Sequence, residues 1–371
     1  MARSTYLVTG GAGFIGSHLC DALVRDGHAV RVLDDLSTGR RVNLPLGVEL
    51  IEGDVADPAA VRAAVAGVDG CFHLAAIASV ARGVEDWLGT HRANLTGTIT
   101  LFDEVRRQPR PVPVVYASSA AVYGDCADLP ITEAATKRPL SAYGADKYAC
   151  ELHAVVASHV HHVPTVGLRF FNVYGPRQDP RSPYSGVISI FCERVRRGVA
   201  IDIFGNGGQT RDFITVADVV VALRAAHGIA QANTQGMPHG MPHGMPLGDV
   251  AARLLPGAPA SPDGPAFAAG PAFAVGPAFA VGPVFPEAPG FPEAPVFNVC
   301  TGIATSVIDL AHTIATLAGV PAEIRHAPSR AGEIRHSVGS PDLARQVLGL
   351  TRPEALPDGL RRVLDWLGPP G

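Results

Sequence analysis

Short, continuously apolar runs alternate with helical patterns over the first half of the chain. The predicted strands are residues 5–9, 29–34, 48–54, 71–75, 112–118 and 165–170. Their unbroken apolar character is typical of parallel strands that are buried on both faces. Helical patterns lie between them, such as 15–26, which Gly27 ends. This alternation predicts an α/β fold with a doubly wound parallel sheet, covered by helices on both faces.

The second half of the chain is interrupted by a segment of different composition. Folded patterns occur at 201–205, 211–228, 296–302, 306–318, 323–326 and 360–367. Residues 231–295 instead repeat proline and glycine every few positions, without a helical or strand period. Because proline lacks a backbone donor and glycine loses the most entropy on ordering, we expect an irregular, mobile insertion there. His239 and His243 have the chemistry of metal ligands, but they are copies of a short repeat, so we predict no metal site.

Composition narrows the class of protein. The net charge is −4 without a basic cluster, so we expect no nucleic-acid partner. No apolar stretch has the length of a membrane span, and the first residues lack the pattern of a signal peptide. The six cysteines form no CxxC pair, which is typical of reduced core cysteines. We therefore expect a cytoplasmic protein with no membrane partner.

A glycine-rich stretch, TGGAGFIG (9–16), follows the first predicted strand. Gly10, Gly13 and Gly16 have the spacing that a dinucleotide-binding loop needs for a tight turn, close contact with a pyrophosphate and close helix packing. The helix that follows offers free N–H groups and the positive end of its dipole to phosphates. Glycines alone fit any tight turn, but their place between the first strand and the first helix predicts a nucleotide site.

Asp34 ends the second predicted strand, at the position expected for a ribose ligand. Its carboxylate can accept hydrogen bonds from both ribose hydroxyls and repels a 2′-phosphate, so it favours NAD over NADP. Arg40 and Arg41 follow and could serve NADP, but we interpret them as solvated loop charges. Asp54, after the third strand, has two interpretations: contact with the adenine, or capping of the helix near Pro58.

A tyrosine and a lysine lie near a pair of serines. YASSAAVYG (116–124) carries Ser118 and Ser119 at the end of a strand, and SAYGADKYA (141–149) begins a helix. Tyr143 and Lys147 are four residues apart, so they share one helix face. A tyrosine hydroxyl ordinarily loses its proton near pH 10, and a nearby cation favours the phenolate. A tyrosine and a lysine at this spacing often occur by chance on an exposed helix face. Together with a nucleotide-binding fold and the two serines, they indicate a tyrosine that acts as a base.

The chain resembles the extended short-chain dehydrogenase/reductase family and, within it, the nucleotide-sugar 4-epimerases. Further matching motifs are HLAAIASV (73–80), NLTGT (94–98), RFFNVYGPRQDP (169–180), FGNGGQTRDFITV (204–216) and RAGEIRHS (330–337). The resemblance implies a Rossmann domain for NAD at 1–170, to which 211–230 returns. It also implies a smaller C-terminal α/β domain for the nucleotide sugar, at 171–210 and 296–371.

The resemblance implies roles for four residues. Tyr143 would be the general base on the sugar 4-hydroxyl, and Ser119 would hydrogen-bond the same hydroxyl. Lys147 would bind the nicotinamide ribose and favour the phenolate, and Asn94 would support an active-site water and the backbone. Hydride would pass from C4 to NAD⁺, the 4-ketose would turn within the pocket, and hydride would return to its opposite face.

The resemblance also implies a wider set of contacts. Those expected to NAD are made by Gly10, Gly13, Phe14, Ile15, Gly16, Asp34, Leu36, Ser37, Thr38, Gly39, Asp54, Val55, Leu74, Ala75, Ala76, Asn94, Ala117, Ser118, Tyr143, Lys147 and Phe170. Those expected to the nucleotide sugar are made by Ser79, Ser119, Asn172, Val187, Phe204, Arg211, Arg330 and Ser337. Two arginines suit a pyrophosphate because each guanidinium presents a fork of donors.

Ala120 and Ala121 point to one branch of this family. The 4,6-dehydratases carry an acid pair at this place for the elimination of water, and decarboxylating relatives place a glutamate there. With two alanines, the keto intermediate can only be reduced back. By this resemblance, Ser337 aligns with a position beside the hexose, where a bulky residue would crowd an N-acetyl group. A serine leaves room, so we expect that UDP-N-acetylglucosamine fits as well as UDP-glucose or UDP-galactose.

Two other hypotheses stay open from the sequence. One is epimerisation of another NDP-sugar; the enzymes for uronic acids use a basic residue near the RQDP turn, where this chain has Asp179 with Arg181 close by. The other is a non-catalytic nucleotide-binding scaffold, which the insertion supports and the intact Ser119, Tyr143 and Lys147 oppose. By resemblance we also expect a homodimer through the helices near 84–106 and 141–159.

Overall fold

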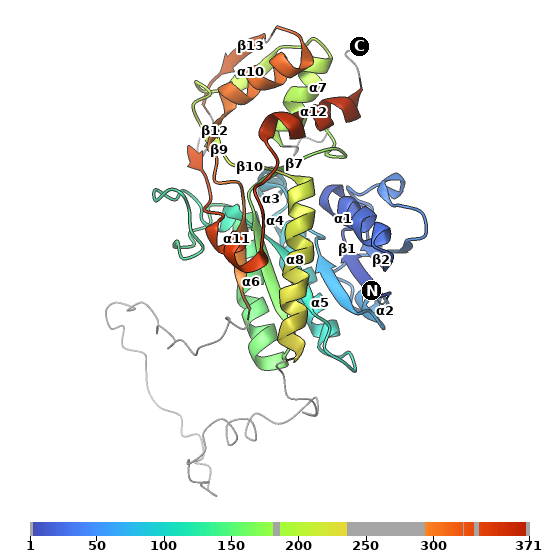
Figure 1. The fold of residues 1–371 in the computed structure, drawn as a ribbon. Helices are drawn as coiled ribbons and strands as arrows, with labels where there is room; N and C mark the ends of the chain where they lie inside the picture. Colours follow the sequence, from blue (N-terminus) through green and yellow to red (C-terminus); the bar gives the residue numbers. More distant parts are fainter. Residues whose placement is uncertain (1–2, 181–185, 236–293, 322, 330–333, 369–371) are drawn as a thin grey trace, which may run out of the picture. The chain divides into compact units, whose positions relative to one another are not determined.

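A seven-stranded parallel sheet forms the centre of the protein. The computed structural model describes residues 3–180, 186–235, 294–321, 323–329 and 334–368 (Figure 1). In spatial order the strands are β11 (Val296–Val299), β6 (Thr165–Phe170), β5 (Val114–Ser119), β4 (Gly70–His73), β1 (Thr5–Thr9), β2 (Ala29–Asp34) and β3 (Glu49–Glu52). Every neighbouring pair is parallel, so the predicted doubly wound sheet is confirmed.

Helices cover both faces of this sheet. One face packs against α1 (Phe14–Arg25), α8 (Val216–Gln235) and α11 (Asp342–Leu348), and α8 runs along it in Figure 1. The other face packs against α2 (Pro58–Val65), α5 (Gly97–Val105) and α6 (Ala142–His161). Side chains alternate along a strand, so Val8 enters the first core and Leu7 the second, and both are fully buried.

The connection from β4 to β5 is a broken helical segment. It begins with α3 (Val80–Glu85) and α4 (Trp87–His91), and a π-helical turn, η2 (Arg92–Thr96), then leads into α5. Ser79 caps α3, since its hydroxyl accepts a hydrogen bond from the Arg82 N–H. The π-helical turn brings Asn94 into the interior, where its side chain is fully buried.

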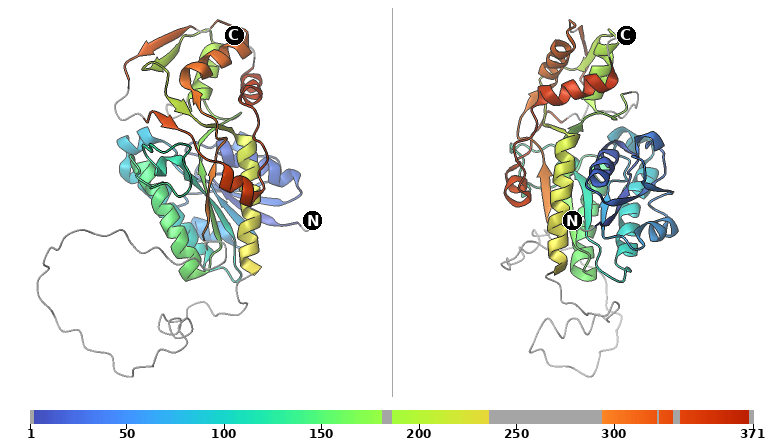
Figure 2. Two further views of the ribbon diagram at one scale, coloured as in Figure 1. Left: turned by 60° about the vertical axis from the view of Figure 1, so that its left-hand side comes forward. Right: turned by 45° about the vertical axis from the view of Figure 1, so that its right-hand side comes forward.

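A third hydrophobic core lies among smaller elements. It packs α7 (Val187–Arg196), α10 (Val307–Ala318) and α12 (Leu356–Leu367) with β8 (Ile201–Phe204), which pairs with β13 (Ile324–Ala327) (Figure 2). Two short sheets accompany it. They are β7 (Asn172–Tyr174) with β10 (Phe213–Thr215), and β12 (Thr305–Ser306) with β9 (Thr210–Arg211) and β14 (His336–Ser337).

The structure moves two predicted boundaries. Residues 231–235 continue α8 instead of beginning the insertion, and the rest of the predicted insertion, with His239 and His243, lies outside the described residues apart from 294 and 295. Residues 296–299, which we grouped with the nucleotide-sugar domain, form the edge strand β11. The hydrogen bonds of β11 satisfy the free edge of β6, which explains why this short run returns to the sheet. The division into two binding domains stays a prediction.

Three further properties concern the part of the chain that the structure describes. All six cysteines are free, and five of them are buried. No group of three His, Cys, Asp or Glu side chains within these ranges could hold a metal ion. Among the helices traced there, none combines the length and the apolarity that a bilayer crossing requires.

Candidate active site

The glycine loop between β1 and α1 is built for close backbone contact. Gly10 has a φ of +68°, and a Cβ there would lie 2.7 Å from the Ala75 nitrogen. A Cβ at Gly16 would overlap the Gly10 carbonyl oxygen. Helix α1 begins after Gly13 without a side-chain cap and without an acidic residue in its first turn. Its free N–H groups therefore remain available to a phosphate, and the cradle fits the pyrophosphate of a dinucleotide.

Asp34 lies at the carboxyl end of β2, beside this loop. One carboxylate oxygen accepts from the Ala12 N–H and the other from the Leu36 N–H, both at 2.9 Å. Burial raises the pKa of the Asp34 carboxyl, and these two hydrogen bonds partly offset the rise. Gly39 packs against the carboxylate, where a Cβ would lie 2.7 Å from Oδ1. The loop at 36–39 is thus tied to Asp34, as a ribose-binding edge requires.

The structure gives the partners of two charged residues near this edge, Arg41 and Asp54. Arg41 pairs with Glu52 while 63% of its side chain is exposed, which fits a solvated loop charge. Asp54 accepts from the Ala56 N–H at 2.7 Å and from Arg92 at 2.9 Å. The cap of α2 is Asp57, so the capping interpretation of Asp54 is wrong. Its contact with the adenine stays a prediction.

His73, to which the sequence motifs assigned no role, organises the floor of the site. The Thr98 hydroxyl donates to the Asn94 carbonyl at 2.6 Å, so its oxygen accepts from Nε2–H of His73 at 2.9 Å. His73 Nδ1 then accepts from the Thr9 hydroxyl at 2.8 Å. Burial, aided by the charge of Lys147, lowers the pKa of His73 to about 3, so the ring is neutral.

The segment after β4 is held by the same groups. Leu74 and Ala75 both donate their N–H groups to the Thr9 hydroxyl oxygen at 3.2 Å. Asn94 accepts from the Ile77 N–H at 2.8 Å and donates to the Ile77 carbonyl at 3.2 Å. The motif HLAAIASV and the π-helical turn therefore fix the backbone that follows β4, next to the glycine loop.

The structure brings together the strand end at Ser119 and the helix that carries Tyr143 and Lys147. Ser141 caps α6 by accepting from the Gly144 N–H at 3.1 Å, so Tyr143 lies in the first helical turn. A Cβ at Gly144 would lie 2.7 Å from the Ala121 oxygen, so this turn packs against the residues after Ser119. Lys147 is almost fully buried, and its Nζ lies 6.0 Å from the centroid of the Tyr143 ring.

Strand β5 and helix α6 are joined by polar contacts in the two helical turns that follow Tyr143. Lys147 Nζ donates to the Ala117 carbonyl at 2.9 Å, and the Ser118 hydroxyl donates to Glu151 at 2.5 Å. Arg169 forms a buried fork with Glu151, at 2.8 and 2.7 Å. Burial by itself would lower the pKa of the Arg169 guanidinium, but the hydrogen bonds and charge of Glu151 more than offset this and raise it. Neither Glu151 nor Arg169 was among the residues that we predicted.

Asp212 gathers several residues of the expected sugar-nucleotide side. Its carboxylate is fully buried and accepts from the N–H and the hydroxyl of Thr301, at 2.8 and 2.7 Å, and from the N–H groups of Gly302 and Gly339. Burial raises its pKa, and these donors partly offset the rise. The Asp212 carbonyl also accepts from the Asn172 side chain at 3.2 Å. Asp212 follows Arg211 directly in the motif FGNGGQTRDFITV, but we predicted no role for it.

Other residues predicted to bind NAD or the nucleotide sugar lie on several different elements. Arg211 lies on β9, opposite Ser337 of β14 in the strand register. Phe170 of β6 stands opposite Ser119 in the register of the main sheet. Val187 begins α7, and Phe204 ends β8. Arg330 lies outside the described residues, so the predicted pair of arginines stays a prediction.

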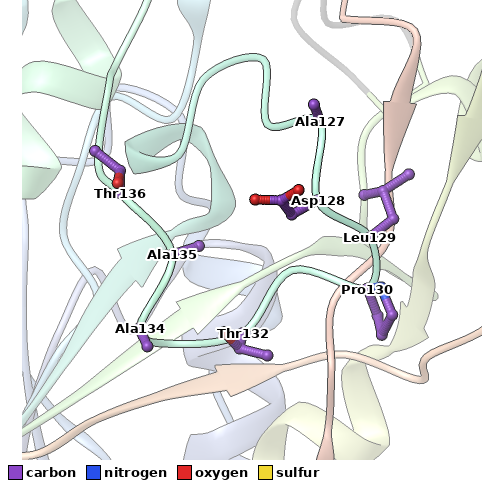
Figure 3. Close-up of a pocket in the computed structure, with 8 residues that line it drawn as sticks. All are labelled: Ala127, Asp128, Leu129, Pro130, Thr132, Ala134, Ala135 and Thr136. Atoms are coloured by element: carbon purple, nitrogen blue, oxygen red, sulfur yellow. The ribbon is translucent and has the colours of Figure 1, made fainter.

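A separate cavity lies in the loop between β5 and α6. It has a volume of about 630 Å³ and opens among residues of 127–136, with Asp128 directed into it (Figure 3). None of the residues predicted to bind NAD or the sugar lines it. Its walls come from one loop, and most of the residues that line it are exposed, so we treat it as a feature of that loop and not as the active site.

Comparison with known proteins gives consistent matches. The family model described as the NAD dependent epimerase/dehydratase family matches residues 6–236. The chain is 32% identical over 367 residues to a UDP-glucose 4-epimerase of Mycolicibacterium smegmatis, covering 97% of each chain.

Two solved structures extend the likeness to the fold. A UDP-N-acetylglucosamine 4-epimerase from Methanobrevibacter ruminantium, in complex with UDP-N-acetylmuramic acid, aligns with a TM-score of 0.77 at 27% identity over 99% of each chain. A Thermus thermophilus UDP-glucose 4-epimerase in complex with NAD aligns with a TM-score of 0.75 at 30% identity, over 98% of this chain and 99% of the other.

Proposed function

The chain belongs to the NAD-dependent epimerase/dehydratase family, and we propose that it inverts C4 of a UDP-hexose or UDP-N-acetylhexosamine through a transient 4-keto intermediate. The observation that carries this choice is the pair Ala120 and Ala121 between Ser119 and Tyr123. A dehydratase needs an acid there to expel water from C5 and C6. With a methyl group at each position, the ketone is retained until it is reduced.

The chain's own residues move a proton and orient the sugar. Tyr143 accepts the proton of the 4-hydroxyl and returns it to the same oxygen when the ketone is reduced. The Nζ of the almost fully buried Lys147 lies 6.0 Å from the ring centroid, and its positive charge favours the phenolate. Ser119, at the end of β5, hydrogen-bonds the same hydroxyl and holds it toward Tyr143. NAD, when bound between the glycine loop and Asp34, supplies a hydride acceptor at C4 and then a hydride donor. Because the cofactor ends unchanged, the protein keeps it bound through turnover.

Arg211 and Ser337 support a sugar diphosphate with a variable hexose. They stand opposite one another on β9 and β14, so one ligand can extend from the guanidinium to the serine. The guanidinium suits a pyrophosphate, and the small serine leaves room for an N-acetyl group. The proposal therefore includes both UDP-glucose and UDP-N-acetylglucosamine as substrates.

The proposal also includes a homodimer formed through α6 and its neighbours. Leu152, Val155, Val156 and Val160 of α6 are between 46% and 53% exposed, and their spacing forms one apolar stripe. Ile99 of the contacting helix α5 is 37% exposed. A second copy would cover this surface. Six free cysteines fit a reducing compartment, which supports a cytoplasmic location.

The direct test is a substrate panel without added cofactor. Purified protein is incubated with UDP-glucose, UDP-N-acetylglucosamine and UDP-glucuronate, and the proton at C4 is followed by NMR. We expect inversion of one or both of the first two sugars at equilibrium. Exclusive inversion of the glucuronate would move the protein to another substrate class, and a 4-keto-6-deoxy product would contradict the epimerase proposal.

A further inference from the structure

Strand β5 and helix α6 are connected by two polar contacts at successive strand residues. Lys147 Nζ donates to the Ala117 carbonyl at 2.9 Å, and the Ser118 hydroxyl donates to Glu151 Oε1 at 2.5 Å. Lys147 and Glu151 are one helical turn apart on α6. The hydrogen bond of Ser118 therefore holds α6 to β5 one helical turn after the hydrogen bond of Lys147.

Glu151 is itself held rigidly. Arg169 donates to both of its oxygens, and Arg169 stands directly opposite Ser118 in the register of β5 and β6. The same guanidinium donates to the Tyr123 hydroxyl at 2.7 Å, which in turn donates to Asn298 at 2.7 Å. All five residues are buried. A carboxylate paired in this way cannot shift without leaving a buried charge unpartnered.

We propose that Ser118, Glu151 and Arg169 form a positioning unit that sets the place of Lys147 and Tyr143 on α6 relative to Ser119 on β5. The proposal rests on the proposed function, in which Tyr143 and Ser119 act on the sugar 4-hydroxyl and Lys147 acts on Tyr143. Ser118 is the member that links strand to helix, because its hydroxyl joins β5 to the carboxylate on α6. Its side chain is occupied by Glu151 and 2% exposed, so the hydroxyl acts through the helix, and the predicted contact of Ser118 with NAD is left to its backbone.

The same helix offers a matched control. Ser158 is 3% exposed, and its hydroxyl donates to the Val163 carbonyl at 2.8 Å and lies 3.0 Å from the Thr165 hydroxyl. It thus ties α6 to the beginning of β6, two turns beyond Glu151. Removing the Ser118 hydroxyl deletes one buried hydrogen bond to α6, and removing the Ser158 hydroxyl deletes two buried hydrogen bonds of α6. Only Ser118 lies next to the attachment of Lys147.

The experiment compares Ser118→Ala with Ser158→Ala in the NAD-loaded protein. We expect similar losses of melting temperature and unchanged bound NAD in both variants. Ser118→Ala should lower kcat by about 10- to 100-fold with KM changed less than about twofold, because misplacement of catalytic groups acts on the chemical step. The acid limb of its kcat–pH profile should move to higher pH, since Lys147 is less well placed to favour the phenolate.

Two further variants complete the test. Ser118→Thr keeps the hydroxyl and should restore most of kcat. Ser118→Cys has a weaker donor, so its kcat should lie between those of the threonine and alanine variants. The cysteine variant also replaces the alanine variant if that one does not fold. Equal kcat in Ser118→Ala and Ser158→Ala, with an unmoved acid limb, would overturn the positioning role. So would a loss confined to KM or to bound NAD. A wild-type protein that inverts no sugar would instead count against the proposed function.

Discussion

At the scale of single residues, the candidate site depends on short-range geometry that the sequence already contains. The spacing of Tyr143 and Lys147 places them one helical turn apart, and Ser141 caps the helix that carries them. Gly10 occupies a backbone conformation and a contact that a side chain would not permit. Such local features were predictable, since spacing and residue type determine them. The contacts of His73, Glu151 and Asp212 were not, because their partners lie far away along the chain, as Thr98 does from His73 and Gly339 from Asp212.

Replacing Tyr143 by phenylalanine tests the assigned base. The variant keeps the ring and loses the hydroxyl, so we expect kcat to fall by about 10²- to 10⁴-fold, as is usual for a lost proton-transfer group. Bound NAD and the melting temperature should stay close to the wild-type values. Tyr148→Phe, on the same helix, is the matched control and should keep its turnover. Equal activities of the two variants would remove Tyr143 from the proposed chemistry.

At the scale of elements, burial explains which parts were predictable. Strands β5 and β6 are apolar over most of their length because helices cover both faces, and the predicted range of β6 matches the observed one. Strands β9, β12 and β14 have two residues each, and only their pairing makes them strands. The π-helical turn at 92–96 has no apolar run or period that would predict it, because the contact that holds Asn94 there is with Ile77, far away along the chain. Short or non-local elements of this kind leave little periodic signal.

The packing of α8 on the sheet predicts a specific dependence of stability on pH. His227 of α8 lies 5.0 Å from Tyr6 and 5.3 Å from Phe72, measured between ring centroids, and its Nε2 has no hydrogen-bond partner among the described residues. Burial, aided by the charge of His28, lowers the pKa of His227 to about 4. The unfolded chain takes up this proton near pH 6.5. Unfolding therefore binds a proton between these values, and the free energy of unfolding falls as the pH is lowered through this window.

His227→Leu removes this titration. Between pH 6.5 and pH 4, its free energy of unfolding should fall less steeply than that of the wild type, by about 1.4 kcal/mol per pH unit. Urea unfolding at several pH values measures the two slopes, and above pH 7 they should coincide. Parallel curves over the acidic range would show that His227 is protonated in the folded protein.

At the scale of the whole molecule, the exposed apolar stripe on α6 predicts association of two copies. Val156→Glu places a charge in this stripe, where a partner's apolar side chains would have to desolvate it. We expect the variant to sediment as a monomer of 38.5 kDa while the wild type sediments at twice that mass. Val221→Glu on α8 alters a valine of similar exposure, 52% against 46%, and should stay dimeric. The same mass for both variants would remove α6 from the interface.

The fate of a deuterium label at C4 distinguishes inversion of the sugar from the alternative reactions. The protein is given UDP-glucose deuterated at C4, without added cofactor, and the product is examined by NMR and mass spectrometry. If hydride leaves C4 and returns to the opposite face of the same sugar, as we propose, the product is UDP-galactose that keeps its deuterium at C4. Inverted product without the deuterium, or a 4-keto-6-deoxy sugar, would contradict it.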